Sequence, residues 1–107
     1  LSDDVALAIR FHTTGRPGMT TLEEITYLAD YIEPGRSGFD GLEELRAACY
    51  QDLDQAMELG MRMSLSEVRD KGVPAHENTV AGHAWYVNNL RRRGLPPLRA
   101  AGIPDAI

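Results

Sequence analysis

Apolar residues at helical spacing, separated by turn-forming segments, constrain the fold of this chain more than any other feature. Leu22, Ile25, Ala29 and Ile32 recur every third or fourth residue, which places them on one face of an α-helix. No segment shows the alternation of apolar and polar residues that is typical of a half-buried strand. The sequence therefore predicts an all-α fold of about four or five helices.

Capping residues predict where these helices begin. Ser2, followed by two aspartates, predicts a first helix at about residues 3–12, and the turn formers of residues 13–18 separate it from the next. A capping box pairs a Ser, Thr or Asp with a Glu three residues later and marks a helix start. The candidate boxes are Thr20 with Glu23, Thr21 with Glu24, and Asp40 with Glu43.

Prolines and glycines predict where the later helices end. Pro34-Gly35 should stop the second helix, and the helical run to about Asp70 is either one helix or two with a kink near Tyr50–Asp52. A last helix is predicted from about Glu77 to Arg93. The prolines and glycines beyond it make residues 95–107 a loop or a disordered end. We therefore expect one domain over residues 1–94 and a C-terminal tail over 95–107.

Composition limits the classes of function. A chain of 107 residues suffices for one small domain. Its net charge of −5 leaves no broad basic surface for a nucleic-acid backbone, and no stretch approaches the length of a membrane span. The single cysteine, Cys49, is expected in the core, and it fits a reducing cytoplasm. Because Leu1 directly precedes a helix, we interpret the chain as a fragment or a processed product.

Two polar clusters could carry chemistry. In the first, His12-Thr13-Thr14-Gly15-Arg16, an imidazole can bind metal, while hydroxyls, loop N–H groups and a guanidinium can face phosphate oxygens. Physical chemistry alone favours a simpler interpretation, a helix-ending histidine with a capping loop. In the second cluster, Asp30 lies within a largely apolar helix. It is either a buried carboxylate that needs a cation or a residue of a solvated face, and spacing cannot decide between these.

The segments IRFHTTGRPGM (residues 9–19) and ITYLADYIEPGR (residues 25–36) resemble those of the YqeK-type HD-domain hydrolases. A looser similarity continues to the Gly72-Val73-Pro74-Ala75-His76 turn, so that the resemblance covers roughly residues 4–90. It implies an HD-domain-like helical bundle of which this chain is the C-terminal part, with the N-terminal helices missing. It also implies metal-dependent, symmetrical cleavage of diadenosine tetraphosphate to two ADP.

The same resemblance implies a set of site residues. Asp30 matches the later metal-binding aspartate of the family, and His12 matches a site histidine near the second metal or the phosphates. Both are therefore expected to be catalytic and to bind metal, which is iron in the best-known members, with manganese or cobalt as alternatives. The residues expected on the substrate side, toward a dinucleoside polyphosphate or ADP, are His12, Thr13, Thr14, Gly15, Arg16 and Arg36.

The chain departs from the family pattern because it contains no His-Asp dipeptide, and its histidines are His12, His76 and His83. His76 is expected at a helix entry, and His83 is expected on the surface or partly buried. We therefore expect the chain alone to be inactive, weakly metal-bound and prone to self-associate, as in a homodimer, until a missing N-terminal segment completes the site. The alternatives are a non-catalytic all-α module that binds a nucleotide or a protein, and an HD phosphohydrolase with another substrate.

Overall fold

The computed structural model describes residues 2–33, 35 and 38–107, and these form five α-helices joined by loops. The helices are α1 (Asp3–Arg10), α2 (Thr21–Ile32), α3 (Leu42–Cys49), α4 (Leu53–Asp70) and α5 (Glu77–Arg93). No β-strand occurs within the described ranges. The predicted all-α fold is confirmed.

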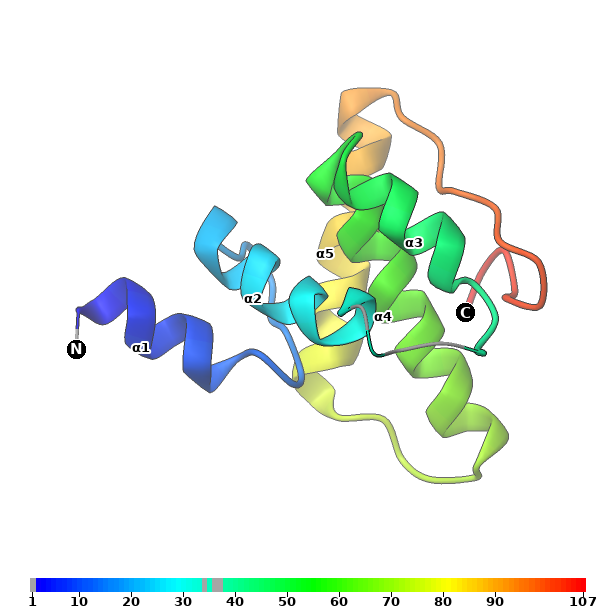
Figure 1. The fold of residues 1–107 in the computed structure, drawn as a ribbon, viewed down its shortest axis with the longest axis horizontal. Helices are drawn as coiled ribbons and strands as arrows, with labels where there is room; N and C mark the ends of the chain where they lie inside the picture. The colour runs from blue at the N-terminus through cyan, green and yellow to red at the C-terminus, as the bar shows by residue number, and fades with distance from the viewer. Residues whose placement is uncertain (1, 34, 36–37) are drawn as a thin grey trace.

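Helices α4 and α5 lie side by side at the centre of the molecule, and α2 and α3 pack against α4 (Figure 1). Among the described helices, α1 contacts only α2, and it projects to the left in Figure 1. The loop of residues 11–20 joins α1 to α2 and carries the first polar cluster. The cluster therefore lies at the edge of the helical bundle.

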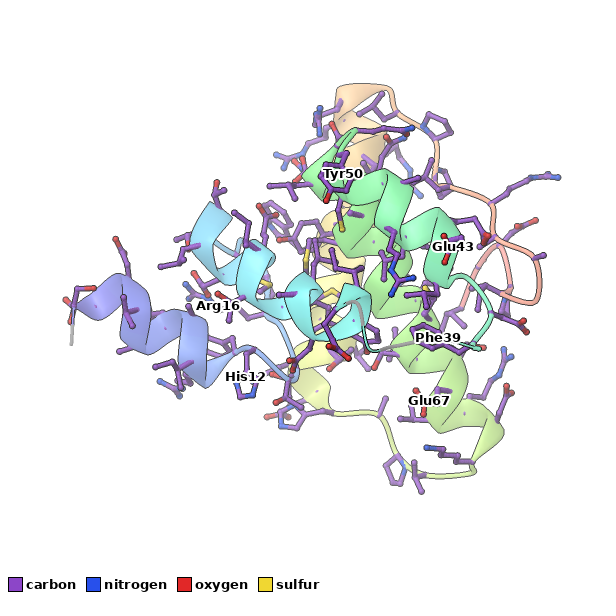
Figure 2. The ribbon with its side chains drawn as sticks, in the orientation of Figure 1. His12, Arg16, Phe39, Glu43, Tyr50 and Glu67 are labelled. Atoms are coloured by element: carbon purple, nitrogen blue, oxygen red, sulfur yellow. The ribbon has the colours of Figure 1, made fainter. Side chains whose placement is uncertain are left out.

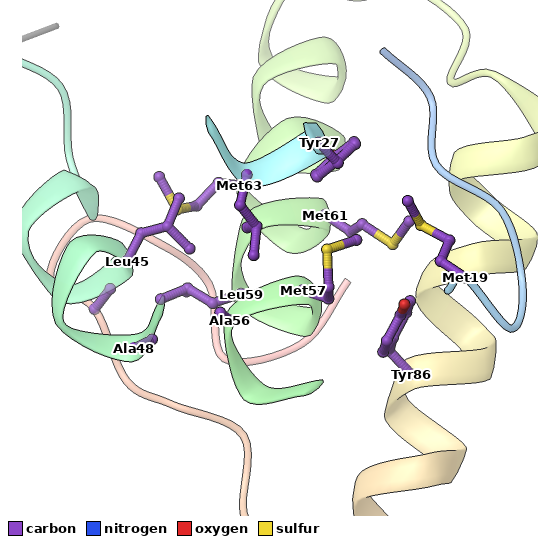
Figure 3. Close-up of a cluster of buried hydrophobic side chains, with 12 residues drawn as sticks. Met19, Tyr27, Leu45, Ala48, Ala56, Met57, Leu59, Met61, Met63 and Tyr86 are labelled. Atoms are coloured by element: carbon purple, nitrogen blue, oxygen red, sulfur yellow. The ribbon is translucent and has the colours of Figure 1, made fainter. Parts of the chain in front are cut away.

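Helix α4 supplies most of the hydrophobic core. Met57, Met61 and Met63 are all buried there, and they pack with residues of α2, α3 and α5 (Figure 3). Tyr86 on α5 is fully buried, and its ring meets that of Trp85 edge to face with 4.8 Å between the centroids. Helices α2, α3 and α5 thus bury apolar residues around one long helix. The core face of α2 is formed by Tyr27 and Leu28, whereas Leu22 and Ile25 of the predicted stripe are exposed.

The first two helices begin where their capping residues predict. Ser2 Oγ accepts the N–H of Val5 at the start of α1. At the start of α2, Thr20 Oγ1 accepts the N–H of Glu23 at 3.2 Å, and Glu23 Oε2 accepts the N–H of Thr20 at 3.0 Å. Helix α1 ends at Arg10, two residues before its predicted end, because the chain enters successive turns there.

Two of the predicted capping boxes are wrong. Thr21 is the first residue of α2 rather than its cap, and the Glu24 carboxylate accepts a hydrogen bond from the Tyr86 hydroxyl at 2.7 Å instead. The cap of α3 is Gly41, which has a φ of 86° and no side-chain hydrogen bond, so Asp40 does not cap this helix. A left-handed glycine turns the chain into α3 one residue later than the Asp40 box requires.

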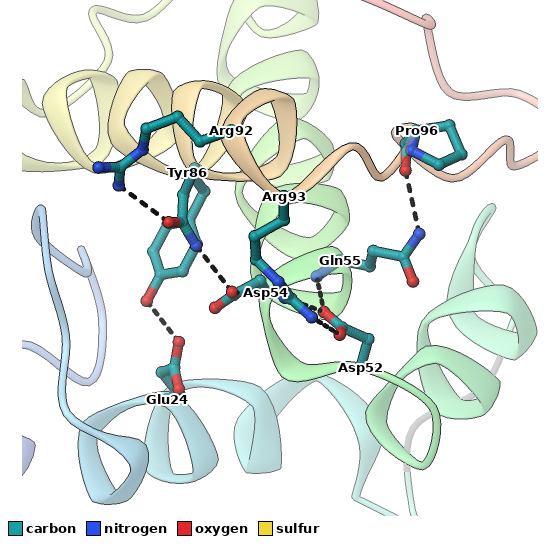
Figure 4. A network of polar contacts seen from close by, with 9 residues as sticks. Glu24, Asp52, Asp54, Gln55, Tyr86, Arg92, Arg93 and Pro96 are labelled. Atoms are coloured by element: carbon teal, nitrogen blue, oxygen red, sulfur yellow. Dashed lines mark hydrogen bonds and ion pairs between the residues drawn. The ribbon is translucent and has the colours of Figure 1, made fainter.

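The run from residue 42 to residue 70 consists of two helices, which settles the alternative that the sequence left open. Residues 50–52 separate α3 from α4, and Asp52 Oδ1 caps α4 by accepting the N–H of Gln55 at 3.0 Å. Arg93 of α5 binds the carboxylates of Asp52 and Asp54, each at 2.7 Å (Figure 4). Cys49, which was expected in the core, is half-buried at the end of α3 and packs against the hydrophobic core. Burial raises the pKa of its thiol.

The tail of residues 95–107 has no helix or strand, but it packs against the core. Ala100 is buried, and the partly buried side chains of Leu98 and Ile103 pack against the core. Gln55 on α4 donates a hydrogen bond to the carbonyl of Pro96 at 3.0 Å. The tail is therefore a loop held by specific contacts. None of the described helices combines the length and the apolar character needed to cross a membrane.

Candidate active site

His12 lies on the surface in the turn that follows α1 (Figure 2). Its Nδ1 is in hydrogen-bond contact with the carbonyl oxygen of Ile9, and its Nε2 lies 3.2 Å from the hydroxyl of Thr13. A carbonyl can only accept, so in the neutral ring Nδ1 carries the proton and the lone pair is on Nε2, where it accepts the hydrogen bond of the Thr13 hydroxyl. This is the arrangement of a metal-ligating histidine, whose second nitrogen donates to a carbonyl or carboxylate.

Arg16 is held in place by Glu23. The Nε and one terminal nitrogen of Arg16 donate to the two carboxylate oxygens of Glu23, at 2.7 and 2.9 Å. Glu23 is fully buried and also accepts the N–H of Thr20. The Arg16 guanidinium, followed by the hydrogen bonds from Thr20, lowers the pKa of the Glu23 carboxyl to about 2. The Arg16 side chain keeps 30% of its surface exposed, so its remaining N–H groups stay accessible.

Of the other loop residues, Thr13 is exposed to solvent, whereas Thr14 and Gly15 make hydrogen bonds within the loop. The Thr14 hydroxyl donates to the carbonyl of Gly15 at 2.9 Å, and the Gly15 N–H donates to the carbonyl of Phe11 at 2.8 Å. Gly15 is buried with a φ of 70°, and a Cβ there would collide with the terminal methyl of Met61. The donors of Thr14 and Gly15 are therefore engaged within the loop.

Asp30 is exposed near the end of α2. This decides the question that spacing left open, because the carboxylate lies on a solvated face of the helix. Among the described residues it makes no hydrogen bond or ion pair. The expected substrate-side residue Arg36 lies outside the described residues.

The expected metal ligands do not by themselves form a metal centre. No hydrogen bond joins His12 to Asp30, and the described part of the chain holds no group of three His, Cys, Asp or Glu side chains that could bind a metal ion. An imidazole and a carboxylate are suitable ligands for iron, manganese or cobalt. Their number is too small for a closed site, so the described residues fit only part of a metal centre.

Apolar side chains surround this polar surface. Ile9 on α1 and Ile25 on α2 keep 53% and 52% of their surfaces exposed, and Val5 and Leu22 on the same two helices are also exposed. Single exposed apolar residues are common, but several on two packed helices mark a surface that can be covered. The four exposed side chains on α1 and α2 form such a surface.

One buried polar cluster escaped prediction. His83, expected on the surface or partly buried, is buried on α5, and its Nε2 lies 2.7 Å from Glu58 Oε2 on α4. Glu58 also accepts two hydrogen bonds from Arg62. Buried charges need such partners. The one signal in the sequence was the spacing of four residues between Glu58 and Arg62, which forms helical ion pairs. His76, in contrast, caps α5 as predicted and accepts the N–H of Asn78.

Comparisons with known proteins identify relatives of the chain. No family model matches it. It is 41% identical over 86 residues to the symmetrical bis(5'-nucleosyl)-tetraphosphatase of Bacillus subtilis, covering 80% of this chain and 46% of the relative. The protein of that name from Halalkalibacterium halodurans is 44% identical over 79 residues, covering 74% of this chain and 42% of the relative. The chain therefore spans about half the length of the curated relatives it matches.

A solved structure agrees with these relatives. The crystal structure of a predicted HD superfamily hydrolase involved in NAD metabolism, from Clostridium acetobutylicum, superposes with a TM-score of 0.79 at 45% sequence identity. The match covers 83% of this chain and 47% of that chain. At this level of identity the common fold reflects common ancestry. The chain is thus homologous to symmetrical bis(5'-nucleosyl)-tetraphosphatases over about half of their length. It has the fold of the matching part of an HD superfamily hydrolase.

Proposed function

We propose that this chain supplies part of a metal-dependent active site that hydrolyses diadenosine tetraphosphate symmetrically, to two ADP. The observation that carries the proposal is the 41% identity to a symmetrical bis(5'-nucleosyl)-tetraphosphatase over 80% of the chain. In this reaction water adds to a phosphorus atom on one side of the central bridging oxygen, and the bond from that phosphorus to the bridge breaks. Further ligands, from a segment like the unmatched half of the relatives, complete the site.

His12 and Asp30 are the residues that we propose as metal ligands with catalytic roles. The lone pair on His12 Nε2 and the exposed carboxylate of Asp30 suit iron, with manganese or cobalt as alternatives. A divalent metal held there supplies a Lewis acid that polarises a phosphoryl oxygen. If His12 faces the phosphates instead of the metal, the same Nε2 lone pair can accept a proton, because the Nδ1–H is already held by the Ile9 carbonyl.

The loop after α1 is proposed to face the substrate. Arg16, fixed by Glu23, offers donors to phosphate oxygens. The exposed Thr13 hydroxyl, which is hydrogen-bonded to His12 Nε2 in this structure, can donate to a phosphate oxygen once a metal takes that lone pair. Thr14 and Gly15 act by shaping the loop, since their own donors are engaged. Arg36 remains a proposed substrate-side residue on the basis of the family resemblance.

Two properties of the whole chain are also part of the proposal. The single cysteine supports a cytoplasmic protein. The exposed apolar surface of α1 and α2 supports self-association of the isolated chain.

A second candidate is an HD phosphohydrolase that acts on another nucleotide. The Clostridium acetobutylicum relative is described by a role in NAD metabolism rather than by cleavage of diadenosine tetraphosphate. A non-catalytic module that binds a nucleotide or a protein is the remaining alternative, supported by the incomplete ligand set of the described residues.

The test is an assay of a chimaera that joins this chain to the unmatched half of the Bacillus subtilis relative. With iron or manganese added, we expect ADP as the only nucleotide product from diadenosine tetraphosphate, and no activity from this chain alone. Asp30→Asn should abolish turnover without loss of folding, since Asp30 is exposed and its carboxylate makes no hydrogen bond or ion pair with the residues that the structure describes. Asp70→Asn, an equally exposed change at the end of α4, is the matched control and should keep activity.

Each other outcome has a definite meaning. ATP and AMP as products would contradict symmetrical cleavage. Hydrolysis of a different nucleotide, with diadenosine tetraphosphate untouched, would favour the second candidate. A chimaera that folds and binds metal but cleaves no nucleotide would leave the non-catalytic module as the correct interpretation.

A further inference from the structure

Two arginines lie against the same aromatic ring beside His12. The guanidinium carbon of Arg10 is 5.1 Å from the centroid of the Phe11 ring, and that of Arg16 is 4.9 Å from it. Both distances are typical of cation–π contacts. The two guanidinium carbons are therefore no farther apart than the sum of these distances, and two positive charges lie against one ring.

Arg16 is the fixed member of the pair. The buried Glu23 carboxylate binds it through two N–H groups, and Phe11 contacts the guanidinium. Arginine has five N–H donors, so donors remain on the exposed part of the side chain. A guanidinium held in this way loses little conformational entropy when an anion binds.

Arg10 is the exposed member of the pair. Among the described residues, no carboxylate or carbonyl accepts a hydrogen bond from the Arg10 guanidinium, which lies against the Phe11 ring. A basic residue suits the last turn of α1 because of the helix dipole. The dipole does not account for a second guanidinium on the same ring, in a chain where acidic residues outnumber basic ones by 16 to 11.

The ligand chemistry follows from this placement. A guanidinium can bind a phosphate through two parallel N–H donors. Two neighbouring guanidinium groups suit an anion that carries charge on successive phosphates. The exposed hydroxyl of Thr13 and the imidazole of His12 lie between the two arginines in sequence, and they add polar groups to the same surface.

We propose that Arg10 and Arg16, held on Phe11, form a binding site for the phosphate chain of a polyphosphate. The identity of the natural ligand rests on the proposed function, since an enzyme for a dinucleoside tetraphosphate must hold several phosphates. Binding itself needs neither catalysis nor metal, so the two proposals fail separately.

The experiment is a titration of this 107-residue chain with inorganic tripolyphosphate, in the presence of a chelator, followed by calorimetry and by backbone amide chemical shifts. We expect shifts concentrated at residues 10–16 and an affinity that falls about tenfold in Arg10→Gln, because a charged hydrogen-bonding group is lost. Arg92→Gln removes the same charge from the last turn of α5 and is the matched control. Phe11→Leu should weaken binding less than Arg10→Gln.

Several results would overturn the site. An unaltered chain that does not bind tripolyphosphate refutes it, and equal weakening by Arg92→Gln shows attraction by overall charge alone. Arg16→Gln could disturb the loop through Glu23, so Arg10→Gln, at an exposed position, is the deciding variant. If binding depends on Arg10 while the chimaera hydrolyses no nucleotide, the anion site stands and the proposed function falls.

Discussion

His83 on α5 and Glu58 on α4 meet inside the molecule, with 2.7 Å between His83 Nε2 and Glu58 Oε2. Arg62 binds the same carboxylate through two N–H groups, at 2.8 and 2.9 Å, and donates further hydrogen bonds to the carbonyls of Leu98 and Pro104. The buried pair of Glu58 and Arg62 on α4 therefore links this helix to α5 and to the tail. A buried guanidinium and carboxylate are tolerated because each has several partners.

Replacing Arg62 by methionine should destabilise the protein strongly. The change leaves the Glu58 carboxylate buried without its main cation. It also removes the two hydrogen bonds that Arg62 donates to carbonyls of the tail. Loss of one partner of a buried ion pair costs about 3–5 kcal/mol, which a shift of the urea unfolding midpoint would measure. Lys71→Met, which breaks an exposed pair with Glu67, should leave the midpoint unchanged. Similar shifts in both variants would contradict the linking role of Arg62.

Acid should weaken the fold through Glu23. Its pKa in the folded chain is about 2, against an ordinary value of 4.5, because Arg16 binds the charged form. A lowered pKa stabilises the folded state above the unfolded pKa, and this contribution is lost as the pH falls from about 4.5 toward 2. Unfolding measured across this range should show a shallower pH dependence in Glu23→Gln than in the unaltered chain.

Glu24 provides the control with the opposite sign. Burial is the main cause that raises its pKa, so its protonation on acidification favours the folded state. Glu24→Gln should therefore keep the acid-induced loss of stability that Glu23 causes. A Glu23→Gln variant with the pH profile of the unaltered chain would contradict the assignment.

Gly15→Ala should be more destabilising than Gly72→Ala. Both glycines have a left-handed φ, 70° and 71°, so either change costs about 1–2 kcal/mol in backbone strain. A Cβ at Gly15 would also collide with the end of the Met61 side chain, whereas nothing lies within 4 Å at Gly72. Overpacking should add about 1–3 kcal/mol to the Gly15 variant in urea unfolding. Equal costs would show that Met61 moves aside freely.

The isolated chain should self-associate through α1 and α2. Ile9 and Ile25 are each about half exposed, at 53% and 52%, and covering apolar surface is favourable. Sedimentation velocity should show oligomers that shift toward monomer in the double variant Ile9→Lys, Ile25→Lys. Val80→Lys, which changes a similarly exposed side chain on α5, should have no such effect. Oligomers that persist in the double variant would place the contact elsewhere.

The helical fold could be predicted because local chemistry specifies it. The helix of residues 21–32 and the box of Thr20 and Glu23 depend on neighbours within a few residues, and both are confirmed. The predicted apolar stripe is not the core face of this helix, because Leu22 and Ile25 are exposed, whereas Tyr27 and Leu28 are buried. The boxes at Thr21 and Asp40 failed because several residues could cap each helix by sequence. At Thr21 a tertiary contact decided, since Tyr86 engages Glu24. At Asp40 the local left-handed turn of Gly41 decided.

The candidate site was predictable only in part. The family resemblance pointed to His12, Arg16 and Asp30 as a set, and the comparisons confirm the relatives while the roles of these residues remain proposals. Spacing could not show that Asp30 faces solvent or that Arg16 is held by Glu23, because burial and pairing depend on how α1 and α2 pack.

The sequence by itself determined the all-α class, the start of α2 and the relatives to which the chain is similar. The tertiary structure alone decided the buried Glu58, Arg62 and His83 cluster, the packing of the tail and the placing of Arg10 and Arg16 on one ring. The physical reason is the distance along the sequence over which each interaction acts. Helix propensity and capping act over a few residues, whereas a buried charge finds its partner only when distant segments meet.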